Sequence, residues 1–229
     1  MRYLIMALSF ILITTHANAL SLSDLSNTEA SSGLKESLIQ GAGKAVSQLS
    51  AIDGFFGNPE VKIPLPSSLK KAEKTMRMLG MGKQSDELIL KMNRAAEAAV
   101  PEAKKLLVDA VKNMSIADAK TILTGSDDAA TQYFKKIISD TMASKFLPIV
   151  KKATENVQLA QQYNKFAEVG RKFGVVNKDQ VNIEQYVTKK TLDGVYLMMA
   201  QEEAAIRKNP MGQASSMLKK VFGVLGESR

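Results

Sequence analysis

Two adjacent carboxylates on one predicted helix are the residues best placed for acid–base chemistry. The six consecutive apolar residues Val195–Ala200 cover every side of a helix, so this helix is expected at the centre of the bundle. Glu202 falls between Val195 and Met198 on the helical wheel. A buried, unpaired carboxylate has a raised pKa and can donate or accept a proton. Glu203 precedes Arg207 by four residues, the order that favours an ion pair on a helix. A proton-transfer group and a structural ion pair are therefore the two alternatives for this helix.

A second polar group has helical spacing in the middle of the chain. Asn93 flanks an apolar stripe, whereas Arg94 and Glu97 lie opposite it on the same helical wheel. The pattern predicts a solvated helix face with an i, i+3 ion pair.

Missing residue types exclude several catalytic classes. The only histidine is His16, inside the predicted leader described below, and the chain has no cysteine. The mature protein therefore lacks the residues for Ser-His-Asp or Cys-His nucleophile systems, for zinc bound by imidazole or thiolate, and for haem held by His or Cys. No D-x-[DN]-x-[DN]-G calcium loop occurs either. We expect no cofactor and no metal.

The N-terminus has the order of a signal peptide. Arg2 precedes an apolar run from Leu4 to Ile13, and Ala17-Asn18-Ala19 supplies a small-x-small cleavage site. The run is about half the ~20 residues that a membrane-spanning helix needs. We therefore expect residues 1–19 to be removed, leaving a periplasmic protein, residues 20–229, that does not span the membrane.

Loss of Arg2 with the leader lowers the formal net charge from +8 to +7. A basic excess suits an anionic lipid or an anionic wall polymer, while export argues against nucleic acid. Mixed Lys and Glu on a helical surface also maintain solubility without any such partner.

Apolar residues at spacings of three and four predict an all-α fold in a single domain, an irregular helical bundle. The expected helices begin near Leu34, Ser67 or Ser68, Ser85, Ser115, Ser126 or Asp127, Ile149, Asn182 and Ser215, and they end near Ile52, Leu79, Met114, Thr124, Pro148, Gly170, Arg207 and Phe222. Pro101 is expected to break, kink or restart the third helix, and Pro148 to interrupt the fifth. Ser115–Asp118 and Asn182–Gln185 have capping-box spacing, and Ser126 or Asp127 is expected to cap its helix. Leu79 is expected on the apolar side of the second helix.

Residues 53–66 are too rich in Pro and Gly to be helical. Their apolar content is too high for a solvated linker. We expect an ordered extended strap that packs Phe55, Phe56, Ile63 and Leu65 onto the helices.

Several motifs in combination resemble one bacterial family, the domain of unknown function 4197. They are GLKESL (33–38), DGFFGN (53–58), NRAAEAA (93–99), DA (118–119) with ILTG (122–125), AATQYF (129–134), YVTKKTLDG (186–194), EEAAIR (202–207) and LKKVFG (218–223). The resemblance covers nearly all of the mature chain and implies an exported protein with this helical domain alone. It supplies no activity. The polar motif positions that it carries over are Glu36, Asn93, Arg94, Glu97, Asp118, Thr131, Glu203 and Arg207.

Three functions follow as hypotheses. The first is a non-enzymatic periplasmic module that binds an envelope partner or an apolar or anionic ligand through a helix groove. The second is a carboxylate-dependent hydrolase of envelope polymers. Glu36-Ser37 is similar to the catalytic pair of lytic transglycosylases, but the Gly-Leu-Met-Gln signature of those enzymes is missing. The third is electrostatic docking on an anionic membrane or wall surface.

Overall fold

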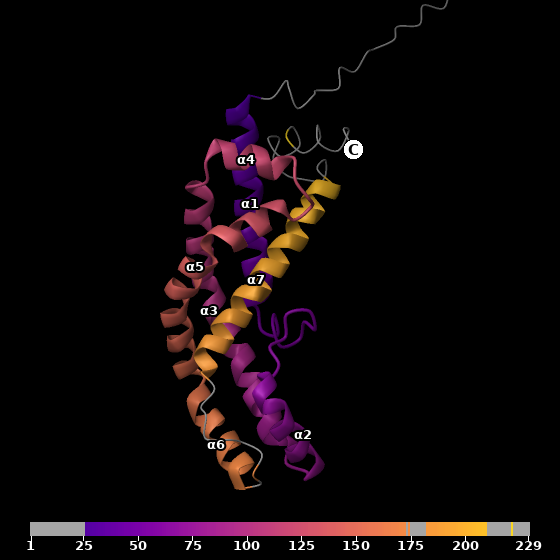
Figure 1. The fold of residues 1–229 in the computed structure, drawn as a ribbon, viewed down its shortest axis with the longest axis vertical. Coiled ribbons are helices and arrows are strands. Elements are labelled where there is room, and N and C mark those ends of the chain that lie inside the picture. The colour runs from indigo at the N-terminus through magenta and orange to yellow at the C-terminus, as the bar shows by residue number, and fades with distance from the viewer. Residues whose placement is uncertain (1–25, 173, 175–181, 210–220, 222–229) are drawn as a thin grey trace, which may run out of the picture.

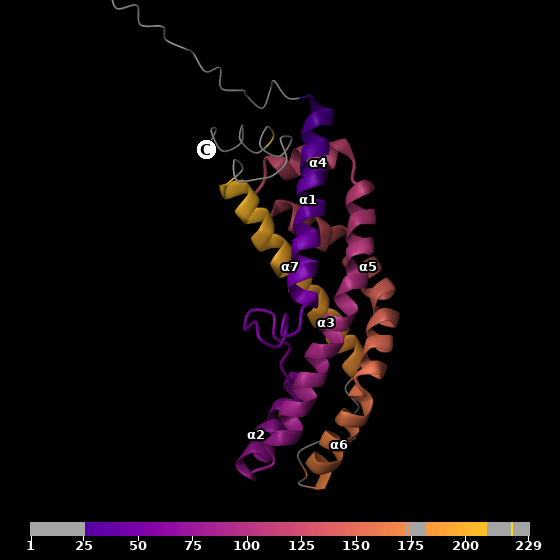
Figure 2. The same cartoon turned by 180° about the vertical axis from the view of Figure 1, so that it is seen from behind.

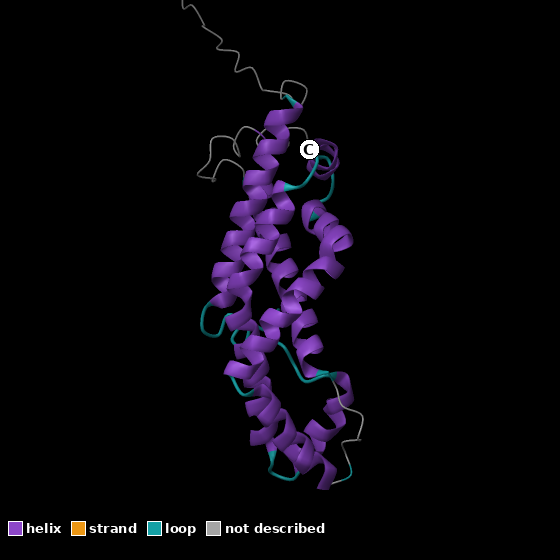
Figure 3. Cartoon of the chain, turned by 90° about the vertical axis from the view of Figure 1, so that its left-hand side faces the viewer, coloured by secondary structure: helices purple, strands orange, loops and turns teal. Residues whose placement is uncertain are grey.

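The computed structural model describes residues 26–172, 174, 182–209 and 221. Within these residues the chain is helical and contains no strand, which confirms the all-α class (Figure 3). The helices are α1 (Asn27–Ser50), α2 (Lys70–Met78), α3 (Gly82–Lys112), α4 (Ile116–Leu123), α5 (Ala129–Asn156), α6 (Leu159–Lys172) and α7 (Ile183–Lys208), with a short 3-10 helix at Ser67–Leu69. The predicted leader lies outside the described residues. So does the predicted helix 215–222, except for Val221, which is buried.

The helices form an elongated bundle in which α7 runs obliquely across the others (Figure 1). It packs against α1, α3 and α5. Seen from behind, α1 and α3 cover the opposite side of α7 (Figure 2). In the apolar run of α7, Val195, Tyr196, Met198 and Met199 are buried, whereas Leu197 is 38% exposed. The prediction of a central helix therefore holds for all but one side of α7.

Local capping fixes where several helices begin. Ser26 and Glu29 form a reciprocal capping box, so α1 begins seven residues before its apolar stripe. The predicted box at Ser115 and Asp118 starts α4. The Asn182 side chain accepts a hydrogen bond from the Gln185 amide and starts α7 as expected.

The two internal prolines do not end their helices. Pro101 lies inside α3 and Pro148 inside α5. The predicted interruption at Pro148 is therefore wrong, because burial of Phe146 and Val150, both 0% exposed, outweighs the ~3 kcal/mol that an internal proline costs. The chain breaks instead at Gln158, between α5 and α6, where φ is 57°. A second error is Leu79, predicted to be on a buried stripe but 50% exposed at the end of α2.

Residues 53–66 form the predicted strap, with turns up to residue 61 and no helix. Phe55, Ile63 and Leu65 are almost completely buried, and Phe56 is half-buried. Gly194 allows this close approach, because a Cβ there would lie 2.8 Å from a ring carbon of Phe55. The strap is thus part of the core.

Candidate functional site

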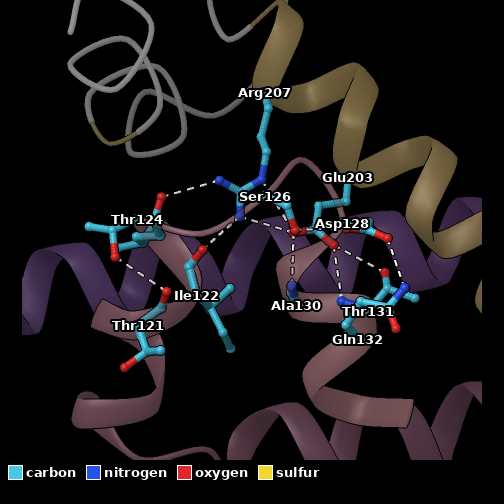
Figure 4. A network of polar contacts seen from close by, with 11 residues as sticks. Thr121, Ile122, Thr124, Ser126, Asp128, Ala130, Thr131, Gln132, Glu203 and Arg207 are labelled. Atoms are coloured by element: carbon cyan, nitrogen blue, oxygen red, sulfur yellow. Dashed lines mark hydrogen bonds and ion pairs between the residues drawn. The ribbon is translucent and has the colours of Figure 1, made fainter. Parts of the chain in front are cut away.

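The most enclosed polar cluster joins α7 to the start of α5 (Figure 4). Glu203 accepts hydrogen bonds from the amides of Ala130 (3.0 Å) and Thr131 (3.1 Å) and from the Thr131 hydroxyl (3.1 Å). These amides belong to the first turn of α5, which has no side-chain cap from its own N-cap residue, Asp128. The predicted cap at Ser126 or Asp127 is therefore wrong. Glu203 supplies the negative charge that a helix N-terminus favours.

Arg207 places a positive charge at the C-terminal end of α4. It binds Glu203 at 3.0 Å and donates to the carbonyls of Ile122 (2.9 Å) and Leu123 (3.2 Å). Cations near a helix C-terminus are favourable for the same electrostatic reason. The side chains of Arg207 and Glu203 are only 4% and 3% exposed. The predicted i, i+4 pair therefore exists, and it clamps two helix ends together.

Asp128 stands beside this clamp. Hydrogen bonds from Gln132 and Ser126, each 2.8 Å long, lower the pKa of Asp128, and the positive charge of Arg207 adds to the effect. The N-cap residue of α5 is thus held in its ionised form.

Glu202 has a different environment from its neighbour. It forms an ion pair with Lys44 of α1, with 2.6 Å between Nζ and Oε2, and it lies 3.5 Å from the amide of Gln48. The Lys44 side chain is 60% exposed, so this pair lies at the edge of the α1–α7 contact. Gly41 of α1 faces the Cβ of Glu202. Glu202 is thus paired, as the structural alternative expects.

The strap is held to α3 by the amide of Asn93, which is completely buried. Its Oδ1 accepts from the Ile63 amide at 2.8 Å, and its Nδ2 donates to the Ile63 carbonyl at 2.9 Å. A further bond from Nδ2 to the Ile89 carbonyl fixes the side chain on its own helix. Asn93 therefore acts as a backbone-like partner for an extended segment that has no neighbouring strand.

Glu97 anchors the other end of the strap. Its Oε1 accepts from the amides of Phe55 and Phe56, both at 3.1 Å, and its Oε2 pairs with Arg94. Arg94 also binds Asp53 at 2.6 Å. Because Glu97 is 5% exposed, the predicted solvated face is wrong. The i, i+3 pair is present, but the periodic pattern could not show that residues 53–66 cover it.

The remaining candidates lie apart from these two clusters. Asp118 caps α4, where hydrogen bonds from Ser115 and then Tyr133 lower the pKa of its carboxyl group. Glu36 is half-buried on α1 and accepts a hydrogen bond from Gln40. The nine predicted residues therefore do not converge on a single open cleft.

A groove that the sequence did not indicate lies between α5 and α7. Its volume is about 640 Å³. Its apolar lining includes Ala143 and Leu147 of α5 and Leu192 and Tyr196 of α7. Nothing in the apolar periodicity distinguishes these positions from ordinary core. One available signal is the polar hydroxyl of Tyr196 inside an otherwise apolar run.

These features define a class: an all-α bundle whose charged motif residues bind its own helix ends and strap, with a separate groove on one side. Residues 24–223 match the family model described as "Protein of unknown function (DUF4197)", and the chain belongs to this family. No curated protein and no solved structure matches the chain. Across the described part of the chain, we find no cluster of His, Cys, Asp or Glu able to hold a metal ion. Nor does any helix described there have the length and apolar character needed to cross a membrane.

Proposed function

We propose that the protein is a non-enzymatic, periplasmic helical module that binds an apolar or anionic ligand of the cell envelope in the groove between α5 and α7. The observation that carries this proposal is the groove itself. Its volume of about 640 Å³ lies within the ~300–1,000 Å³ typical of small-molecule sites, and it combines an apolar lining with a few polar groups.

The carboxylates support a binding role over hydrolysis. A general acid or base must be free to exchange a proton with its substrate. Glu97 and Glu203 are almost fully buried, and they already accept hydrogen bonds from backbone amides and arginine. Glu202 pairs with Lys44. The residues that first suggested acid–base chemistry therefore have a sufficient role in holding the helices and the strap together.

The first experiment tests location. Cell fractionation should recover the protein in the periplasm, and N-terminal sequencing should begin at Leu20. Recovery of the uncut chain in the cytosol would refute the periplasmic assignment.

The second experiment tests binding in the groove. The protein is purified from its native envelope under mild conditions and analysed by native mass spectrometry for bound small molecules. Ala143→Phe places a large side chain in the groove and should abolish the bound mass. Ala117→Phe adds the same side chain at an exposed position of α4 and should leave it unchanged. The proposal fails if no small molecule co-purifies, or if both variants retain it equally.

A further inference from the structure

The groove continues into a second hollow. This hollow, of about 510 Å³, lies between the strap, the start of α5 and α7. The two hollows share Lys135, Lys189, Asp193 and Tyr196. The first is mainly apolar, whereas lysines and acids from three elements line the second. A ligand that spans both would meet an apolar region at one end and a charged region at the other.

Tyr196 lines both hollows, and its hydroxyl oxygen is buried beneath their surface. Tyr196 is 5% exposed, and its hydroxyl makes no hydrogen bond of normal geometry. Burial raises the pKa of Tyr196, and the nearby Ser139 hydroxyl offsets only part of this effect, so the phenol is a neutral donor. A buried donor without a partner is unfavourable. An acceptor oxygen on a ligand would satisfy it.

Most acids around the second hollow already have partners. Asp193 pairs with Lys189 at 2.9 Å. Glu60 accepts a hydrogen bond from Gln201 at 3.1 Å, and Asp128 is held as described above. The charge of Asp193 is therefore neutralised by an ion pair, that of Asp128 is partly offset by the nearby Arg207, and Glu60 keeps its charge with a neutral partner.

Several lysines around the two hollows have no ionic partner among the described residues. Lys62 lies over the ring of Phe56, 4.0 Å from its centroid. Lys135 and Lys190 make no ion pair with any residue that the structure describes. Lys135 lines both hollows and Lys190 lines the second, whereas Asp140 lines only the first. This distribution favours an anionic group at the junction, on the side away from Asp140.

Building on the function proposed above, we infer that the ligand is a single monomeric amphiphile with one acidic head group. The head-group oxygens accept hydrogen bonds from the Tyr196 hydroxyl and from Lys135. The apolar chain lies along Ala143, Leu147 and Leu192. Both hollows lie between elements of the bundle, a space that a single free molecule can enter without the rest of a bilayer, so the geometry favours a free amphiphile over a membrane surface.

The chain has no tryptophan, which allows a clean reporter. Leu147→Trp places the only indole of the protein at the apolar end of the groove, and its emission is followed during titration with dodecanoate or with dodecan-1-ol. Leu79→Trp, at the 50% exposed position that follows α2, is the matched control reporter and should not respond. Dodecanoate should bind at least about tenfold more tightly than dodecan-1-ol, and this preference should decrease as salt is raised.

Two further substitutions, each made in the reporter protein, test the head-group contacts. Tyr196→Phe should reduce the preference for dodecanoate about fivefold or more without lowering thermal stability, because the lost hydroxyl has no partner in the unbound protein. Lys135→Gln should reduce it similarly and flatten the salt dependence. Lys136→Gln, the neighbouring exposed lysine, is the control and should change neither.

The outcomes separate this inference from the function on which it rests. Equal binding of the acid and the alcohol would overturn the inference and leave an apolar binding groove intact. Binding only to anionic phospholipid vesicles, with no response to monomeric dodecanoate, would overturn it in favour of a membrane surface. Failure of both probes, together with the absence of a co-purified small molecule, would refute the proposed function as well.

Discussion

Replacing Glu203 with alanine tests whether the clamp at the α4–α5 junction holds the fold together. The substitution leaves the first-turn amides of α5 without their acceptor. It also removes the carboxylate partner of Arg207, a buried cation whose side chain is 4% exposed and which donates as well to the Ile122 and Leu123 carbonyls. Breaking a buried ion pair by removing one member costs about 3–5 kcal/mol. Since small domains are stable by only about 5–15 kcal/mol, the loss should be large.

The adjacent residue provides the matched control. Glu202→Ala also removes a carboxylate from α7, but the freed Lys44 is 60% exposed and regains water. Such a partly exposed pair contributes about 1 kcal/mol or less. Both variants are unfolded with guanidinium chloride and followed by circular dichroism, and their free energies of unfolding are compared with the unmodified protein.

A third variant checks the reasoning about buried charge. Glu203→Ala combined with Arg207→Met also removes the buried cation that has lost its carboxylate, so the double variant should be more stable than Glu203→Ala alone by about 1 kcal/mol or more. Equal losses of unfolding free energy for Glu202→Ala and Glu203→Ala would refute the account of the clamp. So would a double variant that is less stable than Glu203→Ala alone.

The remaining predictions concern the strap, a glycine and a helix cap. Gly194→Ala should destabilise the protein by about 1–3 kcal/mol through overpacking against the strap, whereas Gly43→Ala, whose Cβ would be 3.9 Å from its nearest neighbour, should stabilise it by about 0.5–1 kcal/mol. Chemical denaturation of the two variants should therefore show opposite shifts. Asn93→Leu should cost about 2–3 kcal/mol, because it leaves a buried amide and carbonyl unpaired. Limited trypsin digestion should cut its strap faster than that of the unmodified protein. The hydrogen bond from Ser115 lowers the folded-state pKa of Asp118, so this carboxylate stabilises the fold above its unfolded pKa of about 3.9 and the effect is lost as pH falls below that value. Asp118→Asn should reduce the loss of stability on acidification. An unfolding temperature that falls with pH as steeply in Asp118→Asn as in the unmodified protein would contradict this.

Patterns within about one helical turn predicted the structure well. The capping box at Ser115 and the N-cap at Asn182 start helices as expected, and the Glu203–Arg207 spacing gives a real ion pair. Such features depend on neighbours in the chain, which a sequence displays directly. The strap was also predictable, because its prolines and glycines exclude a helix.

Long-range packing set the limits of sequence-based prediction. The break at Gln158 carries no proline or glycine, whereas Pro148 continues its helix because its neighbours hold it. Glu97 was expected to face water, and only the folded chain shows the strap lying over it. The groove at Tyr196 depends on how α5 and α7 approach one another, which no periodicity encodes.

The position of α7 has a consequence for the order in which the chain folds. Its glutamates join partners far back in the sequence: Lys44 is 158 residues from Glu202, and Thr131 is 72 from Glu203. A chain that emerges from its N-terminus can form α1 to α6 early, but it cannot bury their shared apolar surface until α7 arrives. Folding should therefore be slower than in helical bundles built from neighbouring pairs. A polypeptide that stops before Ile183 should leave that surface open to aggregation.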